Sequence, residues 1–183
     1  APLGAWHTTY NPLEKMDSVE IVPTDYDKIV RHQLIRGYVH DEAAAFQGGV
    51  SGNAGLFSNA NDLAKVLQLY LNDGSYGGEQ LLSAETVRLF TQTKSPTCRR
   101  GLGFDKPATG GKASPCGSLA SPSVYGHTGF TGICFWVDPD QQLIYIFLSN
   151  RVYPTRSNNK LSSLNIRTRI QDTIYKAIEK KEL

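Results

Sequence analysis

Apolar positions dominate three short segments in the last third of the chain, at residues 124–128, 133–137 and 143–149. Their β-branched and aromatic side chains favour strands. The turn-forming sequence Asp138-Pro139-Asp140-Gln141 separates the second segment from the third, so we expect neighbouring antiparallel strands. A terminal helix is predicted near Leu164 to Lys180, because isoleucines recur there every four residues. A helix that packs its isoleucine side on an antiparallel sheet is an α+β arrangement.

Helical periodicity also marks the middle of the chain. Apolar residues follow an Asn59 or Ser58 N-cap at helical spacing, and Asp73-Gly74 ends this predicted helix. Its apolar side consists of Leu63, Val66, Leu67, Tyr70 and Leu71. Ser83 is expected to cap a second helix over Ala84 to Thr91, with Val87 and Phe90 facing inward.

The first part of the chain carries weaker signals. Residues 1–25 contain three prolines and no helical period, so they are expected to be extended and loop-like. Val19 to Val22 and Gln33 to Val39 are weak strand candidates, and Asp41 to Phe46 predicts a short helix.

Composition narrows the class of protein. The 183 residues include 40% hydrophobic side chains and carry a formal net charge of +2, which fits one globular domain with one core. No broad basic cluster suggests a nucleic-acid partner, and no apolar stretch is long enough to span a bilayer. The N-terminus lacks a signal sequence, so for an exported protein we expect that signal upstream.

Cysteine and glycine patterns give no sign of a metal or a cofactor. Cys98, Cys116 and Cys134 have neither Cys-x-x-Cys spacing nor a nearby histidine. Cys98 and Cys116 are equally compatible with a disulfide and with two free thiols, and Cys134 looks like a small buried strand residue. Gly101-Leu102-Gly103 lacks the third glycine of a phosphate-binding loop, so we expect no cofactor.

The segment Tyr125 to Gly132 carries the clearest chemical signal. Its three glycines allow close backbone approach at a strand edge, and His127 is the titratable side chain among them. The long stretch Lys94 to Ser121 is rich in glycine, proline and serine, and loops of that length tend to be functional. We therefore expect His127, Thr128 and Phe130 to face an open groove lined by this loop.

These residues resemble a known family. His127-Thr128-Gly129 is similar to the third motif, Lys/His-Thr/Ser-Gly, of the class C β-lactamases, DD-peptidases and related esterases. Further similar segments follow the family's order along nearly the whole chain: Pro2-Leu3-Gly4, Gly55-Leu56-Phe57-Ser58, Asp138-Pro139, Ser149-Asn150-Arg151-Val152-Tyr153-Pro154 and the final helix. The stretch from Gly37 to Phe57 looks closest to a bacterial subgroup in which the domain is fused to a family 3 β-N-acetylglucosaminidase. The resemblance implies a partial β-lactamase/DD-peptidase-like fold.

Two motifs of that family are missing. Its nucleophile lies in Ser-x-x-Lys and its proton-handling tyrosine in Tyr-x-Asn, both before Pro-Leu-Gly, which begins here at residue 2. The resemblance therefore implies that residues 1–183 are the C-terminal part of one domain. Formal matches occur at Ser157 to Lys160 and at Tyr70 to Asn72, in a polar loop and inside a predicted helix, and we interpret both as accidental.

The resemblance also implies roles for individual residues. A serine attacks an amide, ester or β-lactam carbonyl, and the Phe130 N–H contributes to the oxyanion hole. His127 would bond the serine and tyrosine network or a substrate carboxylate, Thr128 would bind that carboxylate, and Gly129 completes the motif. Asn150 and Arg151 at the strand end are candidates for shaping the site and binding substrate.

Other histidines and arginines have simpler interpretations. A lone strand histidine is often only a structural hydrogen-bonding group, and His40-Asp41 lacks a nucleophile motif, so Asp41 is expected to brace its loop. His7 and His32 are expected at the surface, and Arg99-Arg100 either grips an acidic substrate or is solvated.

Three functions remain open at this stage. The first is a penicillin-binding or β-lactamase-like hydrolase acting on peptidoglycan-derived peptides outside the cytoplasm, with this part inactive alone. The second is an esterase or amidase on the same scaffold, and the third is a non-catalytic domain attached to a glycosidase. Because the family's first strands would be missing, we also expect an unpaired sheet edge that seeks a partner, including a second copy, or a chain of marginal stability.

Overall fold

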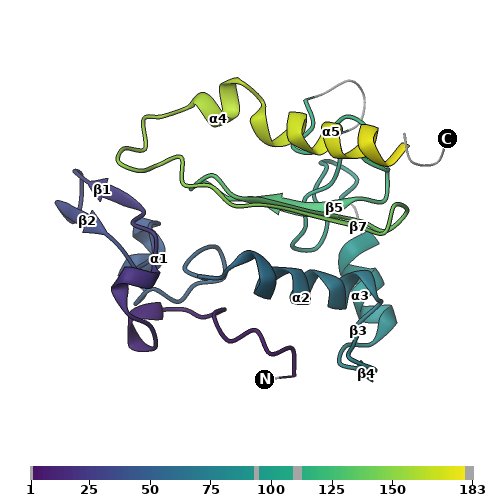
Figure 1. Cartoon of the computed structure of the whole chain (residues 1–183), viewed down its shortest axis with the longest axis horizontal. Coiled ribbons are helices and arrows are strands. Elements are labelled where there is room, and N and C mark those ends of the chain that lie inside the picture. Colours follow the sequence, from purple (N-terminus) through teal and green to yellow (C-terminus); the bar gives the residue numbers. More distant parts are fainter. Residues whose placement is uncertain (1, 93–94, 109–112, 180–183) are drawn as a thin grey trace.

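A three-stranded antiparallel sheet lies between the helix α5 (Ile166–Glu179) and the helix α2 (Ala60–Leu71) in the computed structural model (Figure 1). The structure describes residues 2–92, 95–108 and 113–179. The strands are β5 (Tyr125–Thr128), β6 (Cys134–Asp138) and β7 (Leu143–Phe147), in that order across the sheet. All three predicted strands and the terminal helix are therefore confirmed, and so is the α+β class.

Side chains of β6 alternate between two apolar layers. Trp136 is 1% exposed and belongs to the layer on the α5 side, whereas Val137 is 0% exposed and packs with Leu67 of α2. The α5-side cluster is Cys116, Val124, Cys134, Trp136 and Tyr145, with Ala120, Phe147 and Ile174 against it. The α2-side cluster is Leu67, Tyr125 and Val137, with Tyr70, Leu71, Phe104, Phe135, Ile144 and Ile146 against it. A central strand buried on both faces makes both helices necessary.

The isoleucine side of α5 is not its most buried side, which corrects the sequence expectation. Gln171 and Tyr175 are buried, whereas Ile170 is 38% exposed. The Tyr175 hydroxyl donates to Asp138 Oδ2 at 2.6 Å, and Gln171 Oε1 accepts from the Gly117 N–H at 2.7 Å. Burial and the Asp138 carboxylate raise the pKa of Tyr175, so its hydroxyl stays protonated and donates. These polar contacts set the rotation of the helix.

The N-caps predicted for two other helices are confirmed, and the structure adds the cap of a third. Asn59 caps α2, Ser83 caps α3 (Ala84–Gln92) and Asp41 caps α1 (Glu42–Phe46), each by accepting a backbone N–H. Within α3 the expectation for Phe90 was wrong, because Phe90 is 43% exposed and Thr91 is buried instead. The Thr91 hydroxyl donates to the Val87 carbonyl, which removes the cost of burying it.

Residues 11–50 form a group of short elements beside the sheet, whereas residues 4–9 contact Phe57 and α2 (Figure 1). The short elements are the 3-10 turns η1 (Pro12–Glu14) and η2 (Ser18–Glu20), the hairpin β1 (Asp25–Asp27) and β2 (Gln33–Ile35), and α1. The strand predicted at Val19 to Val22 is wrong, because the Asp17 side chain accepts the Val19 N–H and starts η2. Residues 1–25 were expected to be extended, but they contain both 3-10 turns, and Asp25 is the first residue of β1.

Smaller elements complete the chain. The short hairpin β3 (Ser75–Tyr76) and β4 (Glu79–Gln80) follows α2, and α4 (Lys160–Ser163) precedes α5.

Cys98, Cys116 and Cys134 are all free, with Cys98 exposed and the other two buried, so no disulfide joins Cys98 to Cys116. No helix in the described ranges is long and apolar enough to cross a membrane.

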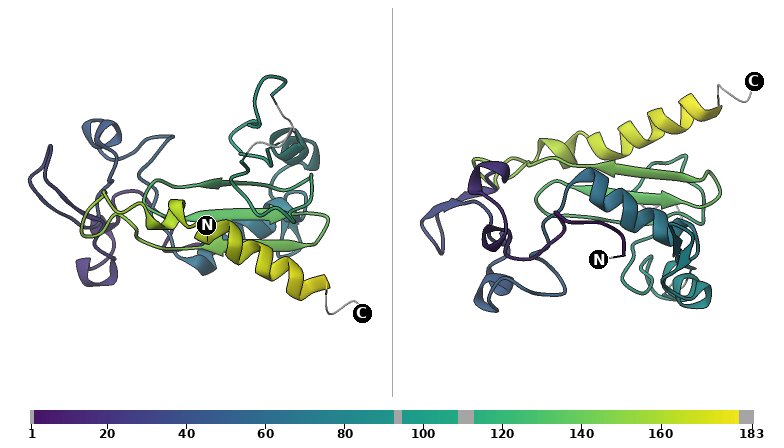
Figure 2. Two further views of the ribbon diagram at one scale, coloured as in Figure 1. Left: turned by 90° about the horizontal axis from the view of Figure 1, so that it is seen from above. Right: turned by 60° about the horizontal axis from the view of Figure 1, so that its bottom comes forward.

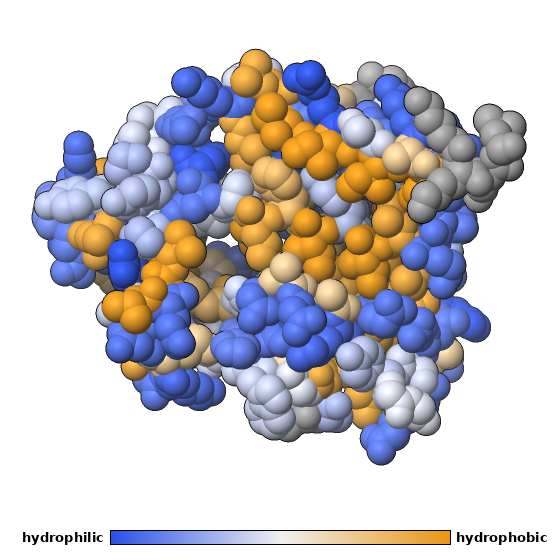
Figure 3. Space-filling model, viewed as in Figure 1, coloured by the Kyte–Doolittle hydropathy of each residue, from blue (hydrophilic) through white to orange (hydrophobic). Residues whose placement is uncertain are grey.

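The two edges of the sheet differ. Asp105 pairs with Gly126 and so covers part of the outer side of β5. Among the described residues β7 pairs only with β6, and Figure 2 shows its other side without a neighbouring strand in either view. Apolar side chains form a band between the α5 and α2 layers in Figure 3, where β7 runs in Figure 1.

We predict that Trp136→Ala lowers the free energy of unfolding by about 3–5 kcal/mol, because it empties the centre of the α5-side cluster. Denaturant unfolding followed by circular dichroism measures this change. The matched control is Trp6→Ala, since Trp6 is 70% exposed and its loss is expected to change stability by less than about 0.5 kcal/mol. Equal effects of the two substitutions would contradict the assignment of the core.

Candidate active site

The connection from β5 to β6 is a tight turn that requires glycine. The Gly129 N–H donates to the Ile133 carbonyl at 2.8 Å, and the Gly132 N–H donates to the Gly129 carbonyl at 3.1 Å. Gly132 has a φ of 120°, and a Cβ there would lie 2.7 Å from Ser149 Oγ. A Cβ on Gly126 would lie 2.1 Å from the Phe135 carbonyl oxygen. Glycines therefore allow β5, the turn and the residues after β7 to approach one another.

His127 and Thr128 lie on opposite faces of β5. Tyr125 packs on the α2 side, so His127, two residues later, shares that side, and Thr128 faces the α5 side. Thr128 lines a polar pocket of about 140 Å³ with Ser114, Pro115, Leu161, Ser162, Asn165, Arg167 and Thr168. The two motif side chains therefore serve different surfaces at one end of the strand.

Two hydrogen bonds fix the His127 ring. Its Nε2 lies 3.0 Å from Arg100 Nη1, and its Nδ1 lies 2.8 Å from the Thr128 carbonyl oxygen. Because arginine only donates, Nε2 accepts, and Nδ1 carries the proton that bonds the carbonyl. The geometry thus selects the neutral Nδ1–H tautomer of His127.

Arg100 belongs to the long loop and is itself anchored. Its Nη2 lies 3.8 Å from Asp105 Oδ2, and Arg99 Nε lies 2.7 Å from Asp105 Oδ1. Asp105 is buried, so the arginine pair neutralises a carboxylate that would be costly to bury alone. Neither arginine is simply solvated, and Arg100 places a positive charge beside His127.

The long loop reaches the motif in two separate places, so the expectation of one open groove faced by His127, Thr128 and Phe130 was wrong. Arg100 contacts His127 on the α2 side, and Ser114 and Pro115 share the pocket of Thr128 on the other side. Lys94 and residues 109–112 of the predicted rim lie outside the described residues. His127 is half-buried and is not packed under α5.

Phe130 projects from the turn and is 61% exposed. Its ring lies 5.6 Å from the His40 ring at an interplanar angle of 25°, and the Arg151 guanidinium lies 4.4 Å from its centre. Its carbonyl accepts from Arg151 Nε at 2.8 Å. Within the part of the chain that the structure describes, the N–H groups of Phe130 and Thr131 have no acceptor.

Asn150 and Arg151 hold the backbone around this turn. Asn150 Nδ2 donates to the Pro23 carbonyl. Arg151 Nη1 donates to the carbonyls of Arg156 and Asn158, in addition to the bond from Nε to the Phe130 carbonyl. The guanidinium of Arg151 is therefore occupied by backbone carbonyl groups and the Phe130 ring.

Sequence reasoning missed the pairing of His40 with Asp25. His40 Nε2 lies 3.1 Å from Asp25 Oδ2, whereas the adjacent Asp41 caps α1, a bracing role as predicted. His7 and His32 are exposed, as expected. No local pattern links His40 to Asp25, since hydrophobic periodicity carries no information on which polar side chains meet.

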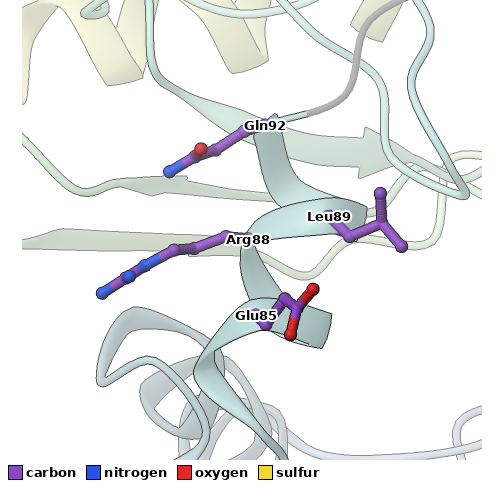
Figure 4. A pocket seen from close by; sticks show the side chains of 4 residues that line it. All are labelled: Glu85, Arg88, Leu89 and Gln92. Carbon is purple, nitrogen blue, oxygen red and sulfur yellow. The ribbon is translucent and has the colours of Figure 1, made fainter.

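The formal nucleophile matches form no catalytic arrangement. Ser157 and Lys160 are both exposed, and the Ser157 hydroxyl contacts Thr155. Tyr70 lies in α2 with its ring edge against Phe104. Figure 4 shows a separate open depression of about 450 Å³ lined by Glu85, Arg88, Leu89 and Gln92, all on α3. It contains no residue of the His127 motif.

Comparisons with known proteins agree with this architecture. The Beta-lactamase family profile matches residues 1–167. A protein of Escherichia coli O157:H7 named "Putative D-alanyl-D-alanine carboxypeptidase" is 38% identical over 201 aligned residues, which cover 98% of this chain and 46% of that protein. A protein of the same name from Salmonella paratyphi B is 37% identical over 88% of this chain and 40% of its own length. The chain thus spans about half the length of these relatives.

Solved structures show the same fold. The LovD9 mutant of simvastatin synthase from Aspergillus terreus superposes with a TM-score of 0.57 at 18% identity, over 98% of this chain and 48% of that protein. This similarity identifies the fold, and the family profile, which covers most of the chain, identifies the family. The chain belongs to the Beta-lactamase family.

Proposed function

We propose that this chain is the C-terminal part of a serine acyl-transfer domain that acts on peptidoglycan-type amide, β-lactam or ester carbonyls. The observation that carries the proposal is the free Phe130 N–H in the turn after His127-Thr128-Gly129. A backbone donor that is already oriented and unoccupied can stabilise the negative oxygen of a tetrahedral intermediate. The family membership and the relatives named as carboxypeptidases support this assignment.

The nucleophile, in this proposal, comes from a part of the protein beyond these 183 residues. A reactive serine needs an adjacent base, and neither formal motif match provides one, because the Ser157 hydroxyl contacts Thr155 and the Tyr70 ring packs against Phe104. The upstream part would carry Ser-x-x-Lys and Tyr-x-Asn. It would also supply strands for the outer edge of β7, which carries the apolar band of Figure 3. Without that part, the same edge would favour self-association.

Arg100 and His127 together form a site for a negatively charged substrate group. The Arg100 side chain is 54% exposed beside His127, so its guanidinium is accessible to a carboxylate. A peptide ending in D-alanine presents such a carboxylate, whereas a neutral ester does not. We assign Thr128 to the polar pocket on the other face of β5, at the same end of the strand, where its hydroxyl can bind a second polar group of the substrate. A peptidoglycan substrate places the protein outside the cytoplasm.

We expect a fluorescent penicillin to label the longer protein but not the isolated 183-residue chain. Labelling requires an activated serine, which the proposal places upstream. Denaturing gel fluorescence and intact mass measure the adduct. Labelling of the isolated chain at one of its own serines would overturn the proposal, and a longer protein without any adduct would favour the non-catalytic accessory role beside a glucosaminidase.

In the longer protein, Arg100→Ala is expected to lower kcat/KM for a D-alanine-terminated peptide by roughly 10- to 100-fold. This magnitude corresponds to the loss of one hydrogen bond to a charged group. Turnover of an uncharged ester is expected to change by less than about threefold, because that substrate lacks the carboxylate. Arg88→Ala is the matched control, since Arg88 is exposed on α3 and pairs with Asp73. An equal loss for both substrates would show that Arg100 only supports the loop.

A further inference from the structure

The ring of Phe130 is held by side chains from two remote parts of the chain. His40 lies just before α1 and stacks on the ring, and Arg151 lies after β7 and places its guanidinium over the ring. Phe130 is 61% exposed, so the core does not determine its position. Its conformation therefore depends on these two neighbours and on the turn itself.

His40 is in turn fixed by buried charges. Its Nε2 bonds Asp25 in β1, and Asp25 is 1% exposed. Arg156 Nε donates to the same carboxylate at 3.2 Å, and its Nη1 donates to Glu42 Oε1 at 2.8 Å. The Arg156 guanidinium lowers the pKa of Glu42, so this carboxylate stays ionised beside it.

The network joins the first 50 residues to the residues after β7. Asp25 and Glu42 belong to the N-terminal group of short elements, and Arg156 follows Arg151, whose Nη1 bonds the Arg156 carbonyl. If the network served only to attach this group to the residues after β7, its contacts would end at the ion pairs of Arg156. The contact from His40 to an exposed ring continues it to the Phe130 turn.

We propose that His40 is a positioning residue, which holds the Phe130 ring so that the Phe130 N–H points toward the reacting carbonyl. The catalytic role of this positioning rests on the proposed function, whereas the claim that His40 holds the Phe130 ring does not. Asp25 and Arg156 set the orientation of the His40 ring, and the stacked ring restricts Phe130. Loss of the stack then frees the turn while β5 and β6 remain paired.

Two substitutions separate stacking from hydrogen bonding. His40→Gln keeps a donor for Asp25 and removes the ring, whereas His40→Phe keeps a flat ring and removes the donor. His7→Gln is the control, because His7 is exposed and contacts α2 through Asp62. Circular dichroism confirms that each variant is folded before comparison.

The readout is the Phe130 amide and ring signals in NMR spectra of the 183-residue chain labelled at phenylalanine. We expect His40→Gln to shift these signals and to lower the 1H–15N Overhauser effect of the Phe130 amide, because a turn released from the ring stack moves more on the picosecond to nanosecond timescale. His40→Phe should leave this Overhauser effect near wild type, and Phe90 on α3 should respond to neither. Unchanged Phe130 signals in His40→Gln, or equal changes in both variants, would overturn the proposal. Where His40→Gln does not fold, His40→Leu takes its place, because leucine lacks the donor, as phenylalanine does, and also lacks the aromatic ring. Unchanged Phe130 signals in His40→Leu would then overturn the proposal.

Kinetics in the longer protein separate this inference from the proposed function. His40→Gln should lower kcat about threefold to tenfold with KM unchanged, and His40→Phe should restore kcat. A fall in kcat and KM together, or no rescue by phenylalanine, would contradict a positioning role. If the wild-type protein turns over no substrate, the proposed function fails, while the NMR result still decides how Phe130 is held.

Discussion

The two-sided burial of β6 is the constraint on which the rest of the structure depends. Trp136 and Val137 are adjacent residues, both almost fully buried, and they face opposite layers. Strand geometry makes such neighbours diverge, so one helix must cover each face. Because β5 pairs with β6 in fixed register, the same alternation sends His127 toward the α2 side and Thr128 toward the α5 side. The layout of the candidate site is thus a consequence of core packing.

The turn after β5 depends on a second constraint, the close approach of three backbone segments. Gly132 lies against Ser149 and Arg151, and Gly126 lies against Phe135. This approach lets Arg151 reach the Phe130 carbonyl and leaves the Phe130 N–H without an internal partner. The N-terminal residues then contribute through His40, which reaches the turn from the opposite end of the sequence. The candidate site therefore draws on the beginning, middle and end of the chain.

Local sequence patterns predicted most of the regular structure, because periodic burial and capping are local properties. The three strands, the caps of α2 and α3, and the terminal helix all follow from residues close together in sequence. The errors arose where a polar contact outweighed hydrophobicity. Tyr175 and Gln171 rotate α5 away from its isoleucine side, and Asp17 starts a 3-10 turn where valines suggested a strand.

The motif residues of the candidate site were proposed from the sequence, but their partners were not. Arg100 meets His127, and Arg156 meets Asp25, across separations that no short pattern encodes. Such pairs form only once the sheet has brought the loops together. The tautomer of His127 and the role of Arg151 likewise depend on atoms that are distant in sequence. Sequence resemblance led to the proposed chemistry, whereas the geometry shows how the motif residues are held.

The central claim is that the Phe130 N–H receives the oxygen of a tetrahedral intermediate formed on a serine from another part of the protein. A crystal structure of the longer protein with a boronic acid inhibitor tests it most directly. The account predicts a covalent bond to the serine of Ser-x-x-Lys, outside residues 1–183, with an inhibitor oxygen about 2.7–3.1 Å from the Phe130 nitrogen. A bond to a serine within these residues, or an inhibitor oxygen held by other donors while the Phe130 N–H points away, would contradict it.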